Sequence, residues 1–457
     1  MSRAPQRLCV IGAGMGGLAA AALLAAQGLE VLVLERGAMI GGKTRFVPQA
    51  QGVTMRDVFA QLFDAARATL PALAPTDPQG RHIWPDGGTL ELHADAARNA
   101  DAIGDFAGAA AARGYRAYAA QARHVFEVLA QPFIFAQRPS AMALMANPAV
   151  SLRLGRAALG TLWDGLAPHF PQPRLRQVFA RAAAQIGCSP MLAPATLMMV
   201  HHIESQGVWR VQGGFVALAE ALAAAARAHG AVIRCGADVA RITVQGGRAR
   251  GVVLRDGETL SADAVLLNAD AIGASLFGPE AARAVPRGAP SFSAITWRLR
   301  AQTALPAQTA LLPDEATAEF TELHYRGRLP AAPSIQIARQ DDTLHAMVNA
   351  PARAVPADAV AACGRQLQAR LAALGVAAEP DGPPTTPDEF AAAFPGTQGA
   401  LYGAALHGWQ AAFNRPPARS ALPGLFICGG GAHPGAGIAM AVQSGRLAAH
   451  AILEDRS

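Results

Sequence analysis

Residues 8–35 constrain the fold more than any other part of the chain. An apolar strand, a glycine-rich turn, an alanine-rich helix and a second apolar strand follow one another there, and the second strand ends at Glu35. Gly12, Gly14 and Gly17 give the turn the spacing G-x-G-x-x-G. Such glycines permit a tight turn, close approach of a pyrophosphate and close helix–strand packing. The segment therefore predicts a dinucleotide site in an α/β domain.

The expected contacts follow from the chemistry of this turn. Backbone N–H groups and the helix dipole receive phosphate charge, while Glu35 is expected to accept a hydrogen bond from ribose or, alternatively, to cap a nearby backbone group. Lys43 is expected to contact phosphate or ribose, with a simple solvated charge as the alternative. The cofactor-binding residues predicted in this part are Gly12, Gly14, Met15, Gly16, Gly17, Glu35, Arg36, Gly42 and Lys43.

A second glycine-rich element lies near the other end of the chain. An apolar strand over 425–428 leads into a glycine-rich loop over 429–437 and a helix over 438–452. A phosphate site at one end and a glycine-rich helix start at the other suit a long ligand such as FAD, whose ring becomes more negative on reduction. The further cofactor-binding residues predicted are Val239, Gly429, Gly430, Gly437, Ile438 and Met440.

Strand and helix patterns between the two glycine-rich elements indicate how the chain is divided into domains. We predict a Rossmann-type FAD-binding domain of the glutathione-reductase/amine-oxidase-like class from residues 1–54, 206–274 and 411–457. A discontinuous α+β substrate domain is expected from residues 55–205 and 275–410. The pattern of 55–205 predicts helices, and that of 275–410 predicts several strands and a helix. The predicted fold class is therefore α/β with two interleaved domains.

Composition narrows the classes of partner. Hydrophobic residues make up 51% of the 457 and charged residues 16%, and the net charge of +6 is carried by arginine apart from Lys43. Because arginines and aromatics do not form a stripe, we expect no nucleic-acid binding, whereas mild positive charge suits an anionic membrane. The five scattered cysteines indicate a reducing compartment. We expect a cytoplasmic protein, peripheral on the inner face of a bacterial membrane, without a secretory signal or spanning helix.

The motifs together resemble the carotenoid-desaturase (phytoene desaturase-like) branch of the FAD-dependent oxidoreductases. The resemblance rests on the first glycine motif, on Gly41–Gly42–Lys43 and above all on residues 429–444, with their His-Pro-Gly-x-Gly string. Strings at 54–59, 83–87 and 407–413 are most similar to the hydroxyneurosporene (1-hydroxycarotenoid 3,4-) desaturases. One departure stands out: ten residues separate Lys43 from Thr54, and the family's Asp-x-Gly-Pro strand is missing.

This resemblance implies a reaction. The implied activity, in carotenoid biosynthesis, removes two hydrogens from the C3–C4 bond of a 1-hydroxycarotenoid such as hydroxyneurosporene, by hydride transfer to flavin N5. A membrane quinone or oxygen would accept the electrons. The alternatives are a phytoene desaturase-type enzyme or another carotenoid desaturase or isomerase, a flavin amine oxidase, and a non-catalytic FAD- or carotenoid-binding protein. A polyene stabilises the resulting cation, so no strong catalytic base is required.

Few polar residues stand out as substrate contacts. His202 and Glu204, beside His201, are candidates for binding the substrate hydroxyl or taking a proton, although such histidines are often structural. His433 is a weaker catalytic candidate in the flavin loop, and Trp209 and Tyr402 are candidate substrate contacts. No metal site is expected, because further ligands at suitable spacing are lacking. The basic amphipathic stretch 142–163 suits either membrane contact or core packing.

Overall fold

The computed structural model describes all residues except 1–5, 48–51, 147–153, 155–158, 287 and 456–457. Its first sheet is parallel and has the strand order β17-β11-β1-β2-β7. The bounds of these strands are β17 (Leu425–Ile427), β11 (Ala264–Leu267), β1 (Arg7–Ile11), β2 (Glu30–Glu35) and β7 (Val232–Cys235). Segments from the start, middle and end of the chain thus form one sheet, as the sequence predicts.

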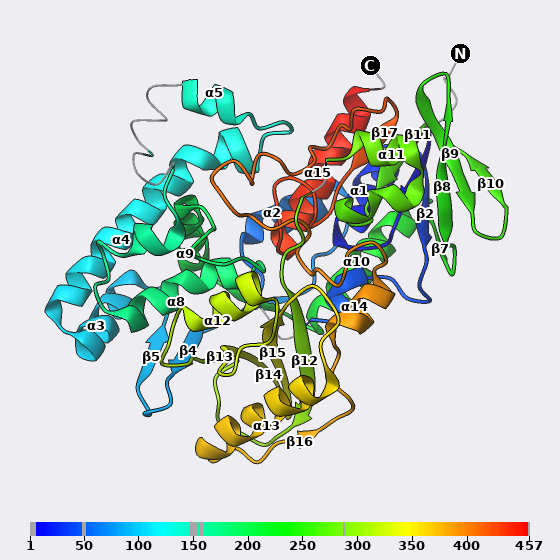
Figure 1. The fold of residues 1–457 in the computed structure, drawn as a ribbon. Coiled ribbons are helices and arrows are strands. Elements are labelled where there is room, and N and C mark those ends of the chain that lie inside the picture. Colours follow the sequence, from blue (N-terminus) through cyan, green and yellow to red (C-terminus); the bar gives the residue numbers. More distant parts are fainter. Residues whose placement is uncertain (1–5, 48–51, 147–153, 155–158, 287, 456–457) are drawn as a thin grey trace.

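Both faces of the central part of this sheet are covered, which explains why β11 and β17 are apolar along their whole length. Leu8 and Val10 face a core shared with the helices, and Cys9 and Ile11 face a second core beneath an antiparallel sheet. The helices are α1 (Met15–Ala26), α2 (Arg56–Ala65), α10 (Gly214–Ala228) and α15 (Ile438–Glu454), and the antiparallel strands are β8 (Val239–Gln245), β9 (Arg248–Leu254) and β10 (Thr259–Ser261). Figure 1 shows α1 in blue beside α15 in red, although they come from opposite ends of the chain.

A second, seven-stranded sheet has the order β16-β12-β15-β14-β13-β4-β5. All neighbours are antiparallel except β13 and β4. The strands are β4 (Gly80–Ile83), β5 (Thr89–Leu92), β12 (Ser293–Arg300), β13 (Gln308–Leu311), β14 (Ile335–Gln340), β15 (Thr343–Ala350) and β16 (Glu379–Pro380), and α13 (Ala357–Ala373) packs on this sheet. The expectation that residues 55–205 are helical was therefore wrong for β4 and β5, whose pairing with β13 supplies tertiary support that short segments lack on their own.

Helices form the remaining layer beside this sheet (Figure 1). They enclose an aromatic-rich core with Tyr115, Tyr118, Phe170 and Phe179. The helices are α3 (Ala96–Ala107), α4 (Ala109–Leu129), α5 (Ala141–Ala146), α7 (Leu162–Leu166), α8 (Pro173–Ala184) and α9 (Met199–Ser205). Much of the amphipathic stretch 142–163 lies outside the described residues.

Further short elements lie between these layers. β3 (Leu73–Pro75) pairs with β6 (Trp209–Val211), and Trp209 also forms a bridge with Val53. Three short helices are α11 (Pro279–Ala284), α12 (Ala318–Phe320) and α14 (Pro387–Ala393). The β3–β6 pairing links segments that the sequence assigns to different domains, whereas Val53 and Trp209 both belong to the predicted FAD-binding domain. The exact domain boundaries stay a prediction.

Candidate functional site

One cavity of about 580 Å³ runs between the first sheet, the second sheet and the helical layer. Gly12 and Gly14 line it from the first glycine turn, Glu35 from the end of β2, and Gly429 and Gly437 from the loop before α15. The two glycine-rich elements, more than 400 residues apart in the chain, thus open onto the same space. A single elongated ligand can therefore reach both.

Most residues predicted to bind the cofactor line this cavity. They are Gly12, Gly14, Met15, Gly16, Glu35, Arg36, Gly42, Lys43, Val239, Gly429, Gly430, Gly437, Ile438 and Met440. Gly17 does not line it. A Cβ atom on Gly17 would lie 2.5 Å from the carbonyl oxygen of Gly12 and 2.8 Å from Nδ2 of Asn268, so this glycine lets α1 pack tightly against the turn.

The two helices that begin at the cavity have free N-termini. Gly14 is the N-cap of α1 and Gly437 that of α15, and neither helix has a capping side chain. The first N–H groups of each helix are thus left for a ligand, and the helix dipoles favour negative charge there. A Cβ atom on Gly430 would meet nothing within 4 Å, so the loop before α15 leaves open space beside it. The part of the cavity between these two helix N-termini, here called the cradle, fits an anionic nucleotide with a flat ring at its far end.

The Glu35 carboxylate is held in place by backbone donors. The N–H of Ala13 donates to its Oε2 and the N–H of Gly37 to its Oε1, each at 2.8 Å. A carboxylate has about four acceptor positions, so these two bonds orient Glu35 and leave capacity for a further donor. Glu35 therefore both caps the glycine turn and lines the cavity, and its contact with ribose stays a prediction.

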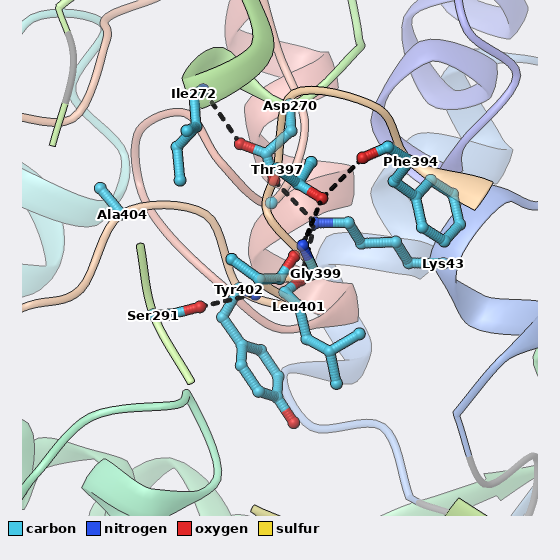
Figure 2. Close-up of polar contacts among 12 residues, drawn as sticks. Lys43, Asp270, Ile272, Ser291, Phe394, Thr397, Gly399, Leu401, Tyr402 and Ala404 are labelled. Atoms are coloured by element: carbon cyan, nitrogen blue, oxygen red, sulfur yellow. Dashed lines mark hydrogen bonds and ion pairs between the residues drawn. The ribbon is translucent and has the colours of Figure 1, made fainter. Parts of the chain in front are cut away.

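Lys43, in a short 3-10 helix over Gly42–Arg45, reaches Asp270 and a loop far along the chain (Figure 2). Its ammonium donates to Oδ2 of Asp270 at 2.7 Å and to the carbonyls of Ala400 and Leu401 at 2.9 and 3.0 Å. Asp270 is 5% exposed, so this ion pair is largely buried. All three ammonium protons are used within the protein. Lys43 therefore holds residues 400–401 against the cavity, and contact with phosphate would require exchange of one of these bonds.

Asn268 is a central residue that sequence reasoning missed. It follows β11, and its Nδ2 donates to the carbonyl of Gly12 at 2.9 Å. A Cβ atom on Gly16 or Gly429 would lie 2.9 Å from its Oδ1, so its amide sits between the two glycine loops. The available signal was a polar residue directly after an apolar strand, in a sheet whose strand ends form the ligand crevice.

Arg415 connects the loop over residues 402–404 to the loop before α15. Its guanidinium donates to the carbonyl of Gly430 at 2.8 Å and to those of Tyr402 and Ala404 at 3.1 and 3.0 Å. Tyr402, a predicted substrate contact, does line the cavity. Burial raises the pKa of its phenol to about 12, so the phenol is neutral at physiological pH. Sequence reasoning missed Arg415, which shares no motif with its partners.

The two neighbouring histidines of α9 lie in different surroundings, one at the cavity and the other packed between helices. His201 lines the cavity, and burial lowers its pKa to about 4, so it is neutral. His202 does not line it and packs against the ring of Phe126 instead. Glu204 lines the cavity; burial raises its pKa, and the charge of Arg181 partly opposes that effect. Glu204 thus lies where the sequence suggests, while His202 does not.

Two other candidates lie outside the cavity lining. Nε2 of His433 is 3.0 Å from the carbonyl of Ala136, and its ring packs edge-on against Phe133. Burial lowers the pKa of His433 to about 4, which makes it a neutral residue that shapes the loop before α15. Trp209 packs against the first core, and its neighbour Val208 lines the cavity instead. These positions do not support direct contact with a ligand in this cavity.

The described part of the chain offers neither a metal site nor a membrane-spanning helix. There, no three histidine, cysteine, aspartate or glutamate residues gather as a metal ion would require. Among the helices outside the undescribed ranges, none combines the length and apolar character needed to cross a membrane.

Comparison with known proteins places the chain among flavin and carotenoid enzymes. It is 37% identical to the hydroxyneurosporene desaturase of Rubrivivax gelatinosus, over 98% of this chain and 93% of that protein. It is likewise 37% identical to the hydroxyneurosporene desaturase of Rhodobacter capsulatus, over 99% of each. The two alignments span 489 and 494 positions against 457 residues here, so these relatives carry residues that this chain lacks.

The fold agrees with these similarities. Cyclohexylamine oxidase from Brevibacterium oxydans superposes with a TM-score of 0.60 at 17% identity, covering 99% of both chains. The family model for flavin containing amine oxidoreductase matches residues 15–453, from the start of α1 to the last turns of α15. The chain therefore belongs to the flavin-containing amine oxidoreductase family, with a Rossmann-type α/β fold.

Proposed function

We propose that the protein is an FAD-dependent carotenoid desaturase that removes two hydrogens from the C3–C4 bond of a 1-hydroxycarotenoid such as hydroxyneurosporene. The observation that carries the proposal is the single cavity shared by two free helix N-termini and an apolar wall, in a chain 37% identical to hydroxyneurosporene desaturases over nearly its whole length. Membership of a flavin family supports a flavin, and the two-ended cradle supports FAD in particular.

The residues at each end of the cradle have distinct tasks toward FAD. The N-terminus of α1 and the turn at Gly12 and Gly14 would hold the pyrophosphate, with Glu35 beside the ribose. The N-terminus of α15, at Gly437 and Ile438, would face the ring. Gly430 leaves room where a side chain would intrude. When bound, the flavin supplies an acceptor for a hydride, which is two electrons and one proton from a substrate C–H bond.

The chain's own contribution to the reaction is placement of the substrate. Loss of hydride from the allylic C4 leaves a cation spread along the polyene, and loss of a proton from C3 then completes the C3–C4 double bond. Because the delocalised cation acidifies that proton, a water molecule or weak base is a sufficient acceptor. The substrate end of the cavity has apolar side chains that suit an isoprenoid chain and exclude bulk water, among them Leu92, Ile186, Val200, Ile203 and Met347.

Delivery of so apolar a substrate is part of the proposal. We place the protein in the cytoplasm, in peripheral contact with the inner face of a bacterial membrane, where a quinone or oxygen would take the electrons. Met142 and Leu159, both within the amphipathic stretch, are 82% and 63% exposed. With a net charge of +6, such apolar anchors would favour anionic lipid. Flotation with anionic but not neutral liposomes is expected, and absence of flotation with either would remove the membrane contact.

Anaerobic flavin reduction tests the proposed activity. FAD-loaded protein is mixed separately with 1-hydroxyneurosporene, phytoene and a simple amine. We expect flavin bleaching and a polyene one double bond longer with 1-hydroxyneurosporene, and much slower bleaching with the other two. Bleaching by phytoene in its place would select a phytoene desaturase-type enzyme, and bleaching by the amine alone an amine oxidase. An unbleached flavin with all three would favour a non-catalytic binding protein.

A further inference from the structure

Two oppositely charged side chains face the apolar substrate end of the cavity without pairing. Arg181 on α8 and Glu204 on α9 both line the cavity. No ion pair within 4.0 Å joins them, although each is close enough to influence the other electrostatically. Among the described residues, Nε of Arg181 is buried without a hydrogen-bond partner, and the carboxyl of Glu204 has no hydrogen-bond or ion-pair partner.

Such an arrangement is costly unless something completes it. A charge or polar group removed from water loses several kcal/mol of solvation unless a partner replaces the water. Other polar groups at this end are already paired: the amide of Asn99 bonds to the backbone of His93 and to the hydroxyl of Tyr115. Among the described residues lining this end, Arg181 and Glu204 are thus the charged groups that remain unpaired beside the apolar walls formed by Ile203 and Met347.

We propose that Arg181 and Glu204 together bind the hydroxyl group of the carotenoid substrate. An alcohol has one hydrogen to donate and lone pairs that accept, whereas a guanidinium only donates and a carboxylate only accepts. A hydroxyl between them satisfies all three groups, with Arg181 donating to its oxygen and its hydrogen donated to Glu204. Hydrogen bonds to charged groups are the stronger class. A hydrocarbon end group at the same place leaves both charges unsatisfied.

This inference rests on the proposed function and names what selects its substrate. The hydroxyl stands on C1, two carbons from the C3–C4 bond, so holding it also restricts where that bond lies in the cavity. A site built to hydrogen-bond a hydroxyl rejects the analogue without one by large factors, because its own polar groups are then left unpaired. Arg181 and Glu204 are therefore specificity and positioning residues, and they form or break no covalent bond.

The test compares two substrates that differ only in this group, 1-hydroxyneurosporene and 1,2-dihydroneurosporene. For the FAD-loaded wild type we expect kcat/KM to be about 100-fold or more higher with the hydroxylated carotenoid. Glu204→Leu and Arg181→Met should each reduce that preference about tenfold or more, by lowering kcat/KM for the hydroxylated carotenoid alone. Glu204→Gln keeps an acceptor and should retain most of the preference. The Kd of each carotenoid, from quenching of tryptophan fluorescence, should follow the same order without turnover.

Glu319→Gln is the matched control. Glu319 is also a buried carboxyl, it is bonded to Ser334 and it does not line this cavity. It should leave the substrate preference unchanged. Equal oxidation of both carotenoids by the wild type would overturn the hydroxyl site while the desaturase function stands. If kcat/KM falls equally for both carotenoids in Glu204→Leu and Arg181→Met, these two residues have a merely structural role. Oxidation of neither carotenoid by the wild type would overturn the function and, with it, this site.

Discussion

Replacing Lys43 by methionine should destabilise the protein through the loop that lysine holds. Methionine keeps most of the length of the side chain but removes three hydrogen bonds, to Asp270, Ala400 and Leu401, and leaves a carboxylate that is 5% exposed without its cation. Breaking a buried ion pair by removing one partner costs about 3–5 kcal/mol. Because the Lys43 side chain is itself 25% exposed, we expect the lower part of that range, about 3 kcal/mol.

Thermal unfolding of flavin-free protein measures this cost. The entropy of unfolding scales with chain length, so for 457 residues about 3 kcal/mol corresponds to a fall in Tm of about 3 °C. In a double-mutant cycle with Asp270→Asn, which keeps the Oδ1 acceptor for the N–H of Ile272, the coupling energy should be about 1–3 kcal/mol.

The matched control is Arg7→Met, which removes an exposed ion pair with Glu30. Both side chains of that pair are more than half exposed, so its loss should cost less than about 1 kcal/mol. The reasoning is refuted if Lys43→Met is no more destabilising than Arg7→Met, or if the effects of Lys43→Met and Asp270→Asn simply add.

Two further predictions concern the glycine loops and the buried histidines. Gly17→Ala should destabilise the flavin-free protein by about 1–3 kcal/mol, because the added methyl group meets the backbone of Gly12. Gly430→Ala should leave stability unchanged but weaken flavin binding, since its methyl group points into open space. Unfolding curves and flavin titration check both variants, and equal stability of the two would contradict the packing argument. Burial holds the pKa of His433 at about 4, below the unfolded value of 6.5, so the unfolded state binds more protons between these pH values and stability should fall as pH drops from 6.5 toward 4. His433→Asn should reduce that slope by at most about 1.4 kcal/mol per pH unit, as measured by urea unfolding across this range, and an unchanged slope would contradict a buried neutral His433.

The nucleotide-binding part of the fold was predictable because local sequence signals and tertiary structure agree there. The strand predicted over 425–428 is one residue longer than β17, and the helix predicted over 438–452 is two residues shorter than α15. The central strands β11 and β17 are buried on both faces and so are apolar, and glycines mark the turns of the nucleotide-binding part. β4 was missed because Gly80–Ile83 is short and contains Arg81 and His82, and its stability comes from pairing with β13 and β5.

The parts of the candidate site that are formed by glycine-rich backbone could be predicted from the sequence. The parts that depend on side chains meeting from distant segments could not. Glycine spacing indicated both ends of the cradle. Arg415, by contrast, acts through carbonyls in two loops that no local pattern links to it. Arg181 carried a weak signal, since it lies three residues after the buried Val178 and so on the apolar face of α8. A lone arginine on an apolar helix face indicates a polar function in the interior, and its partner Glu204 comes from another helix.

A practical consequence follows from the position of Lys43. It is the only lysine in the sequence, and it lines the cavity with a quarter of its side chain exposed. Apart from the α-amino group, an amine-reactive dye or acylating reagent therefore has one chemical target in the whole protein, and that target stands beside the cofactor cradle. The extent of its acylation, read by mass spectrometry, reports occupancy of the cradle in a crude mixture without any engineered label.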